Sequence, residues 1–221
     1  MRTLRIWDLP TRLFHWLLAA CVVGLFITGK IGGDVMTWHF RLGYAVFSLL
    51  LFRLVWGVVG GHWSRFASFI YAPSTLWRYL HGESRPEHHA GHNPLGALSV
   101  FGLLTVLGVQ VGSGLISDDE IAAAGPLTRY VSGDTVSLAT AYHTEVGQLL
   151  VIALVALHIA AILFYRLKKK ENLVQPMLQG DKLVPDASPL PASRDDGFSR
   201  WKALLIWAAC AGLVYWIAGL G

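Results

Sequence analysis

The sequence predicts an all-α membrane protein with five transmembrane helices. Hydrophobic residues make up 54% of the 221 positions and charged residues only 14%, and mean hydropathy is +0.49, all typical of a membrane protein. The apolar residues gather into five blocks, each close to the roughly 20 residues that a helix needs to cross the hydrocarbon. Such unbroken runs exclude the alternating strands of a closed barrel. The expected helices cover residues 12–29, 37–59, 95–116, 142–166 and 202–220.

The Lys and Arg residues predict the orientation, because cytoplasmic segments of membrane proteins are enriched in both. Of the 18, all except Lys30, Arg41 and Arg129 lie on the side of the predicted N-terminus. We therefore expect the N-terminus in the cytoplasm and the C-terminus in the periplasm, across a bacterial inner membrane. This topology accounts for the positive net charge of +4, so the charge gives no reason to expect nucleic acid as a partner. Membrane lipid is the expected environment.

A lipoprotein signal is the alternative for the first helix, because residues 18–21 read Leu-Ala-Ala-Cys. Asp8, Pro10 and His15 interrupt such a signal. The apolar run also continues beyond Cys21, so we expect the first helix to remain in the protein.

The domain organisation is expected to be simple, with residues 1–182 forming one transmembrane domain that holds the first four helices. Within it, residues 73–80 are expected to form an amphipathic helix in the interface, with Trp77 at headgroup level. Residues 183–200 combine prolines with Ser and Asp and are expected to be a flexible cytoplasmic linker. Residues 201–221 then form the additional helix.

Four histidines lie inside the predicted helices, where an ionisable side chain indicates a partner, a cavity or a cofactor. His15 and His158 lie near inner helix ends, and His39 and His143 lie near outer ends. In a uniform α-helix, the separation of His143 and His158 gives about 22 Å of rise and about 60° of azimuth. Depth therefore pairs His15 with His158 in an inner layer, and His39 with His143 in an outer layer.

Paired imidazoles across a bundle suit the iron of a haem, which takes one axial ligand from each side of a flat macrocycle. Gly43 and Gly147 each follow an outer histidine by four residues, so each is expected on the same helix face, where a porphyrin edge can approach. Glycines also expected to thin the interior are Gly24, Gly108 and Gly112, although the spacing of the last two is typical of helix packing. Basic residues expected to hold propionates are Arg12, Arg53 and Arg166 on the inner side and Arg41 on the outer side.

A zinc site and a proton relay are the alternatives for the four histidines. Zinc would be expected to recruit cysteine or carboxylate, and the nearby Glu145 lies close enough to the membrane surface to be solvated. Further histidines lie outside the helices in a segment expected to be a solvated loop, although they could bind metal. They are His62, His81, His88, His89 and His92.

Six ordered motifs carry a resemblance to a known family. They are RIWDLPTRLFHW, HFRLGYAVFSLLLFRLVWG, GHNPLGALSV, SDDEIAAAGPL, HTEVGQLLVIALVALHIAAILFY and LVQPMLQGDKLV. Over about residues 5–182 the chain resembles the bacterial cytochrome b561 family and the related b-type cytochrome subunits of nickel-iron hydrogenases. The resemblance implies a four-helix core with two b haems, each held by two histidines at the positions His15, His39, His143 and His158. The fifth helix goes beyond that core and is expected to pack peripherally or to bind a partner.

Two protein ligands on each iron leave no open position for oxygen, so we expect outer-sphere electron transfer. The two haems would connect the quinone pool with a periplasmic redox partner such as a c-type cytochrome. Candidate quinone contacts are the residues near the membrane faces, among them Trp16, Trp38 and Tyr142. The sequence contains no pattern for the direction of electron flow or the oligomeric state.

Three other functions remain open from the sequence. The chain could oxidise superoxide and reduce quinone, as some family members do, with an outer basic pocket around Lys30, Arg41 and Arg129. It could be the membrane anchor subunit of a hydrogenase-type complex, which would co-purify with a large partner. A transporter without haem is the last alternative.

Overall fold

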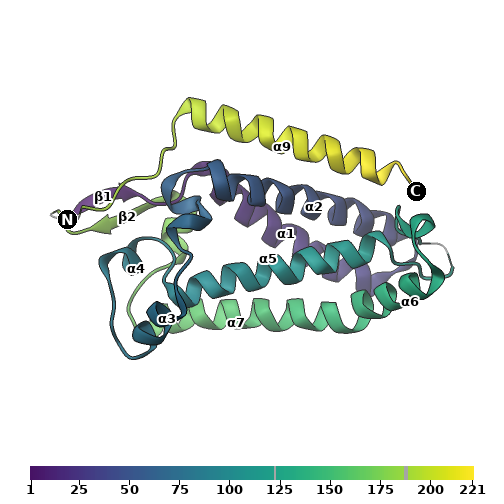
Figure 1. The fold of residues 1–221 in the computed structure, drawn as a ribbon, viewed down its shortest axis with the longest axis horizontal. Coiled ribbons are helices and arrows are strands. Elements are labelled where there is room, and N and C mark those ends of the chain that lie inside the picture. The colour runs from purple at the N-terminus through teal and green to yellow at the C-terminus, as the bar shows by residue number, and fades with distance from the viewer. Residues whose placement is uncertain (122, 187–188) are drawn as a thin grey trace. The chain divides into compact units, whose positions relative to one another are not determined.

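The computed structural model describes residues 1–121, 123–186 and 189–221. Within them, five helices are long and apolar enough to cross a membrane (Figure 1). The spans are Leu9–Ile31 (α1), Gly33–Val59 (mostly α2, Met36–Val59), Pro94–Leu115 (α5), Gly133–Leu167 and Gly197–Ala218 (α9). The predicted all-α membrane fold is confirmed.

The fourth span begins earlier than predicted. It consists of α6 (Gly133–Ala141), the π-helical segment η5 (Tyr142–Gly147) and α7 (Gln148–Leu167). Ser132 caps the first turn by accepting a hydrogen bond from the backbone N–H of Thr135 at 3.3 Å. The polar residues of this first part hid it from hydropathy, and the assumption of a uniform α-helix is wrong for η5.

Shorter elements precede, connect or extend the long helices. The amphipathic helix expected at residues 73–80 is confirmed as α3 (Pro73–Leu80). The others are the strands β1 (Arg2–Arg5) and β2 (Asp181–Val184), the helices α4 (Pro86–Ala90) and α8 (Val174–Gln179), and the 3₁₀ turns η1 (Gly33–Val35), η2 (His62–Ser64), η3 (Phe66–Ser68) and η4 (Thr128–Tyr130).

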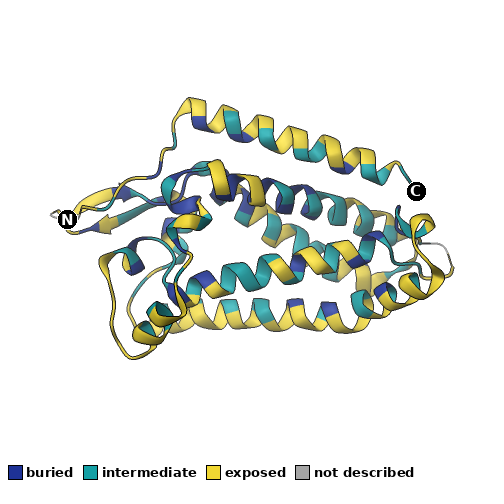
Figure 2. Ribbon diagram, viewed as in Figure 1, coloured by how far each residue is buried: buried dark blue, intermediate teal, exposed yellow. Residues whose placement is uncertain are grey.

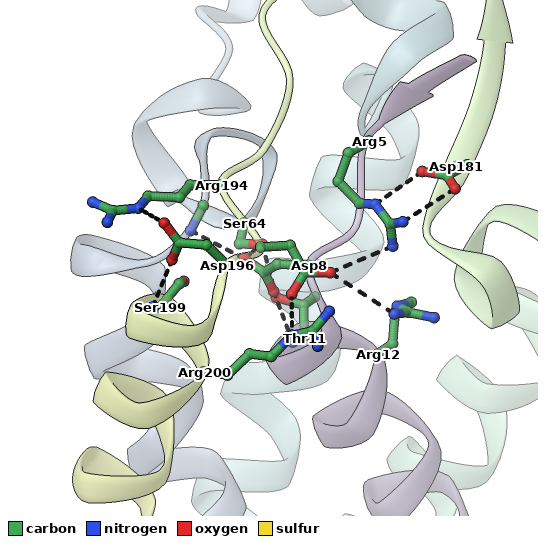
Figure 3. A network of polar contacts seen from close by, with 12 residues as sticks. Arg5, Asp8, Thr11, Arg12, Ser64, Asp181, Arg194, Asp196, Ser199 and Arg200 are labelled. Atoms are coloured by element: carbon green, nitrogen blue, oxygen red, sulfur yellow. Dashed lines mark hydrogen bonds and ion pairs between the residues drawn. The ribbon is translucent and has the colours of Figure 1, made fainter.

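The two strands form an antiparallel ribbon that the sequence did not predict. Arg2 pairs with Val184 and Arg5 with Asp181, and Nε of Arg5 also lies 2.9 Å from a carboxylate oxygen of Asp181 (Figure 3). Each strand has only four residues, and the two strands are far apart in the sequence, at residues 2–5 and 181–184. Neither strand therefore has a local pattern that would reveal the pairing.

The chain divides into two compact units. Unit 1 comprises Met1–Phe14, Arg53–Gly102 and Ala156–Leu204, and unit 2 comprises His15–Phe52, Leu103–Val155 and Leu205–Gly221. Every Lys and Arg of the sequence belongs to unit 1, except for the three residues Lys30, Arg41 and Arg129. The Lys and Arg residues predicted to be cytoplasmic are thus the ones that belong to unit 1, and the three predicted to be periplasmic belong to unit 2.

Unit 1 is organised around a buried carboxylate. Asp8 is 0% exposed and lies at the start of α1. It accepts hydrogen bonds from the backbone N–H of Thr11 at 2.9 Å and from Oγ of Ser64 at 2.8 Å (Figure 3). It also accepts from the backbone N–H of Gly61 at 3.0 Å and from Nε1 of Trp56 at 3.2 Å. One side chain thus joins the start of α1, the end of α2 and the turn that follows α2.

Part of the segment expected to be a flexible linker, residues 191–193, is hydrogen-bonded within unit 1. Ser193 is 5% exposed, donates from its backbone N–H to the carbonyl of Arg5 at 2.8 Å, and donates from Oγ to the carbonyl of Ile6 at 2.6 Å. Nε1 of Trp63 donates to the carbonyl of Pro191 at 2.8 Å. These bonds need partners distant in sequence, so the proline content of the segment did not reveal them.

Unit 2 contains a four-helix core. Its buried cluster consists of Val46 and Leu50 of α2, Leu107 of α5 and Val151 of α7, and residues of α1 such as Val22 pack against it. Helix α9 contributes no residue to this cluster, and many of its side chains are exposed (Figure 2). The predicted distinction between a four-helix core and an additional fifth helix is confirmed.

Removal of the buried carboxylate should destabilise the protein. Asp8→Ala leaves several buried donors without an acceptor, so we expect the free energy of unfolding to fall by about 3 kcal/mol or more. Thermal unfolding of the detergent-purified protein measures the effect. The matched control is Asp186→Ala, because the side chain of Asp186 is 74% exposed. Equal unfolding temperatures for the two variants would contradict the role of Asp8.

Candidate functional site

Unit 2 encloses an apolar cavity of about 370 Å³. Its walls come from α1, α2, α5 and η5, and His39 and His143 both line it. Mostly apolar walls with a few convergent polar groups are typical of a cofactor site. The predicted outer pair of histidines is therefore brought together in one cavity.

The ring of His39 is oriented by α1. Its Nδ1 lies 3.1 Å from the carbonyl oxygen of Leu25 and 3.3 Å from Oγ1 of Thr28. The Thr28 hydroxyl donates to the carbonyl of Gly24 at 2.8 Å, so it meets Nδ1 as an acceptor. Both neighbours place the proton on Nδ1, which leaves Nε2 with its lone pair.

The ring of His143 is oriented in the same way by α5. Its Nδ1 lies 2.9 Å from the carbonyl oxygen of Gln110 and 3.3 Å from Oγ of Ser113. The Ser113 hydroxyl donates to that same carbonyl at 2.9 Å. Nε2 of His143 is thus also the nitrogen left to bind a metal.

The separation of the two rings fits one iron between them. The centroids of His39 and His143 are 6.2 Å apart, with an angle of 85° between the ring planes. An imidazole nitrogen binds a metal at about 2 Å, and the ring centroid lies roughly 1 Å behind it, so two axial rings on one metal have centroids roughly 6 Å apart. The residues present therefore fit a haem held by two histidines.

Three glycines leave room around the two rings. Gly43 lines the cavity, and an added Cβ there meets no atom within 4 Å. A Cβ on Gly29 would lie 3.2 Å from the ring of His39, and a Cβ on Gly114 would lie 2.8 Å from the ring of His143. The expected open space beside Gly43 is present, and the other two glycines let helices pack directly against the ligand rings.

Gly147 has a different surrounding from the one expected. An added Cβ would overlap with Oε1 of Gln110, whose Nε2 donates to the carbonyl of His143 at 2.9 Å. A side chain that inserts into the helical hydrogen-bond ladder is a known cause of local distortion, and here the inserted amide coincides with η5. The absent side chain of Gly147 therefore makes room for Gln110.

The other glycines divide between packing and open surroundings. A Cβ on Gly24 would lie 2.8 Å from the side chain of Leu42, so Gly24 permits close packing of α1 and α2. Gly108 and Gly112 are exposed and an added Cβ there meets nothing within 4 Å, so they do not thin the interior of unit 2.

The inner histidines belong to different units. His15 lies in unit 2, where its ring packs edge-on against that of Trp16 with 4.9 Å between centroids. His158 lies in unit 1, where Nδ1 is 3.5 Å from Oγ of Ser99. Both side chains are half-buried, which is the condition expected of ligand side chains in a bundle.

Arg53 is the strongest candidate among the basic residues predicted to hold propionates. It is 3% exposed, lies over the ring of Phe66 at 4.6 Å, and its Nη1 has no hydrogen-bond partner within the described part of the chain. A buried guanidinium N–H without an acceptor is costly, and a carboxylate would satisfy it.

The other predicted arginines are placed differently. Arg12 donates from Nη1 to the carbonyl of Leu178 at 2.6 Å and approaches Asp195 at 4.0 Å, so its guanidinium already has partners in unit 1, although its buried Nε has none among the described residues. Arg41 stacks over Trp38 at 4.9 Å and does not line the cavity, and Arg166 is exposed. Lys30 lines the cavity, and sequence reasoning had considered this residue only for the superoxide hypothesis.

The loop histidines are not uniformly solvated. His81 and His89 are exposed, but His88 is 5% exposed and packs edge-on between Tyr71 and Tyr79. This burial lowers the pKa of His88. Across residues 1–121, 123–186 and 189–221, no three His, Cys, Asp or Glu side chains form a group that could hold a metal ion.

Sequence reasoning missed the residues that orient the ligands. Leu25, Thr28, Gln110 and Ser113 act on the two rings from neighbouring helices. A polar cluster in an apolar helix was the available signal, since Gln110 and Ser113 lie in the VQVGSG stretch of α5. In a membrane such residues are expected to face a partner.

The comparison with protein families decides the assignment. A family described as prokaryotic cytochrome b561 matches residues 6–180. The chain belongs to this family. It is therefore a multi-pass membrane b-type cytochrome that transfers electrons with haem b as its cofactor, and the resemblance inferred from the motifs is confirmed.

Curated relatives cover most of the chain. The probable Ni/Fe-hydrogenase B-type cytochrome subunit of Azotobacter chroococcum mcd 1 is 25% identical over 222 residues, covering 83% of this chain and 90% of the relative. The probable Ni/Fe-hydrogenase 1 B-type cytochrome subunit of Escherichia coli (strain K12) is 26% identical over 214 residues, covering 79% and 88%. No solved structure matches the chain significantly.

A side chain added at Gly43 should exclude haem from the cavity. Gly43→Leu fills space that faces the cavity, so we expect a lower ratio of haem to protein in a pyridine haemochrome assay. Gly108→Leu is the matched control, because Gly108 also has open surroundings but does not line the cavity. Equal haem loss in both variants would show that the cavity is not the haem site.

Replacement of Gln110 should weaken haem binding through His143. Gln110→Leu removes the side-chain bond to the backbone carbonyl of His143 but keeps the Gln110 carbonyl that accepts from the ring. One such hydrogen bond contributes about 1 kcal/mol, so we expect haem release to become about fivefold faster. Haem release to apomyoglobin measures the change. Ser117→Ala serves as control, since Ser117 also lines the cavity but donates its hydroxyl to the carbonyl of Ser113, four residues earlier, and not to either ligand histidine. Unchanged release from the Gln110 variant would exclude this role.

Proposed function

We propose that the chain is a di-haem b-type cytochrome that carries electrons across a bacterial inner membrane, between the quinone pool and a redox partner at the periplasmic face. The observation that supports it most is the facing pair of His39 and His143, each with Nδ1 bonded to a carbonyl of a neighbouring helix. A bound haem supplies one-electron redox chemistry at its iron.

His39 and His143 would hold the outer haem through their Nε2 atoms. Because both ligands come from the protein, no coordination position is left for oxygen, and the residues favour electron transfer over oxygen chemistry. The apolar walls of the cavity exclude water, and burial together with hydrogen bonding to the ligands tunes the potential. Lys30 would meet a propionate at the cavity.

His15 and His158 would hold the inner haem, as their depth in the sequence predicts. The buried Nη1 of Arg53 supports a carboxylate ligand in unit 1, and a haem propionate has that chemistry. Two haems at different depths would divide the crossing of the bilayer into shorter steps.

The orientation rests on the distribution of positive charge. Unit 1 holds every Lys and Arg except Lys30, Arg41 and Arg129, so we place unit 1 at the cytoplasmic side and the C-terminus in the periplasm. Quinone would approach from the lipid near aromatic residues. Trp16 and Trp38, exposed by 41% and 57%, remain the candidates together with Tyr142.

The partner at the periplasmic face would be a redox protein. A c-type cytochrome is one candidate. A hydrogenase-type complex is favoured by the relatives named as hydrogenase cytochrome subunits, which align with most of this chain. In the second case the chain would serve as the membrane anchor of the complex, and the large partner would co-purify with it.

The superoxide hypothesis receives less support from the cavity. It required a basic outer pocket around Lys30, Arg41 and Arg129, but of these three only Lys30 lines the cavity. Asp118 and Asp119 line it as well and would repel an anion.

Single histidine variants test the two haem sites. His39→Ala and His143→Ala should each remove the outer haem, and His15→Ala and His158→Ala should each remove the inner one. The haemochrome ratio would then fall from about two haems per chain to about one, and redox titration would show the same component missing within each pair.

The control for these variants is His81→Ala, because His81 is exposed and lies outside the spans. It should keep both haems. Loss of different redox components from His39→Ala and His143→Ala would overturn the outer pair. Loss of different components from His15→Ala and His158→Ala would overturn the inner pair and leave the outer one standing.

A further inference from the structure

Unit 1 contains a second hollow, of about 410 Å³, where α2 ends and α9 begins. Its lining includes Arg65, Arg194 and Lys202 together with His62, and no Asp or Glu is part of that lining. Three cationic side chains around one hollow at the end of two transmembrane helices are a strong site for an anion.

The walls of this hollow are built from buried hydrogen bonds. Pro191 accepts from Nε1 of Trp63 at 2.8 Å, and Oγ of the buried Ser193 accepts from the backbone N–H of Trp63 at 3.2 Å. At Gly61, which also lines the hollow, an added Cβ would lie 2.5 Å from the carboxylate of Asp8, so only glycine fits. The hollow is therefore a fixed feature of unit 1.

The charged groups are held around the hollow in different ways. Nζ of Lys202 donates to the carbonyl of Val59 at 3.0 Å, which ties the first turns of α9 to the end of α2. Nε of Arg194 pairs with Asp196 at 2.7 Å (Figure 3). Arg65 has no carboxylate partner among the ion pairs of the described residues and lies 3.3 Å from Nδ1 of His62.

Arg65, Arg194 and Lys202 supply the positive charge of the hollow. Burial and the nearby Arg65 both lower the pKa of His62, which disfavours its charged form. Its imidazole can exchange hydrogen bonds with a phosphate. Asp196 offsets part of the charge of Arg194, but Arg65 and Lys202 keep the hollow positive.

Apolar surface adjoins the basic hollow. Phe198 and Trp201 of α9 are 68% and 66% exposed, which is typical of aromatic residues at headgroup level. Val55 and Val58 of α2 and Leu204 of α9 are exposed on the turns that lead from the hollow into the spans. Because these residues belong to membrane spans, lipid acyl chains cover them, and a phospholipid headgroup is therefore at hand beside the hollow.

We propose that this hollow binds the phosphate group of an anionic phospholipid, with Arg65, Arg194 and Lys202 around the headgroup and the acyl chains along α2 and α9. The segment 191–194 then has a role beyond connecting two helices, because it forms one wall of the lipid site. Bound lipid would also fasten the start of the additional helix to unit 1.

Native mass spectrometry of the haem-loaded, detergent-purified protein tests the site. Titration with phosphatidylglycerol and with phosphatidylcholine should show at least about tenfold tighter binding of the anionic lipid, since each basic residue near a membrane surface contributes about a fivefold factor. Arg65→Gln should weaken phosphatidylglycerol binding about fivefold, and Arg65→Gln with Lys202→Gln roughly 25-fold.

Lys168→Gln is the matched control, because Lys168 is exposed in unit 1 and does not line the hollow. It should bind phosphatidylglycerol like the unaltered protein. If Lys202→Gln disturbs the helix contact and lowers the unfolding temperature, the single variant Arg65→Gln tests the proposal, because Arg65 is exposed.

A separate titration with inorganic phosphate distinguishes a phospholipid headgroup from a soluble phosphate as the occupant of the hollow. The proposal requires that inorganic phosphate does not displace phosphatidylglycerol at equal concentration. Displacement would overturn the lipid assignment in favour of a soluble anion. Equal binding of both lipids, or unchanged binding in the double variant, would show that the hollow is not an anion site.

Discussion

The bonds from Nδ1 of His39 and His143 to helix carbonyls are the constraint on which the proposed haem site depends. An imidazole in an apolar interior must satisfy its N–H, and the carbonyls of Leu25 and Gln110 have a lone pair to accept it. Each bond fixes both the tautomer and the direction of Nε2. Two rings so oriented, with 6.2 Å between centroids, have the spacing that the proposed haem iron requires.

Other features of unit 2 follow from the need to bring helices close to these rings. Gly29 and Gly114 let backbones approach the imidazoles, and Gly147 makes room for the amide of Gln110. The π-helical segment η5 is the local cost of that insertion, and it lies at the ligand itself. Unit 1 has a separate anchor in Asp8, whose buried carboxylate joins segments from α1 and α2 and helps to shape the basic hollow.

The sequence predicted those features that depend on local composition. Apolar blocks gave the five spans because each must satisfy its own backbone in lipid, and the period of residues 73–80 gave α3. The four histidines stood out because imidazole is rare in apolar helices. The antiparallel ribbon, the anchoring of Ser193 and the insertion of Gln110 could not be predicted, because each needs a partner far away in the chain. Helical spacing placed Gly147 on the face of His143, whereas in the structure Gly147 lies in the π-helical η5 and adjoins Gln110.

An experimental density map of the haem-loaded protein tests the central claim most directly. The predicted result is a haem in the cavity of unit 2, with its iron bound by Nε2 of His39 and of His143, and with both Nδ1 atoms still on the carbonyls of Leu25 and Gln110. A haem held in this cavity by any other residue, or a cavity filled by the repacking of its own side chains in a protein that carries haem elsewhere, would contradict it.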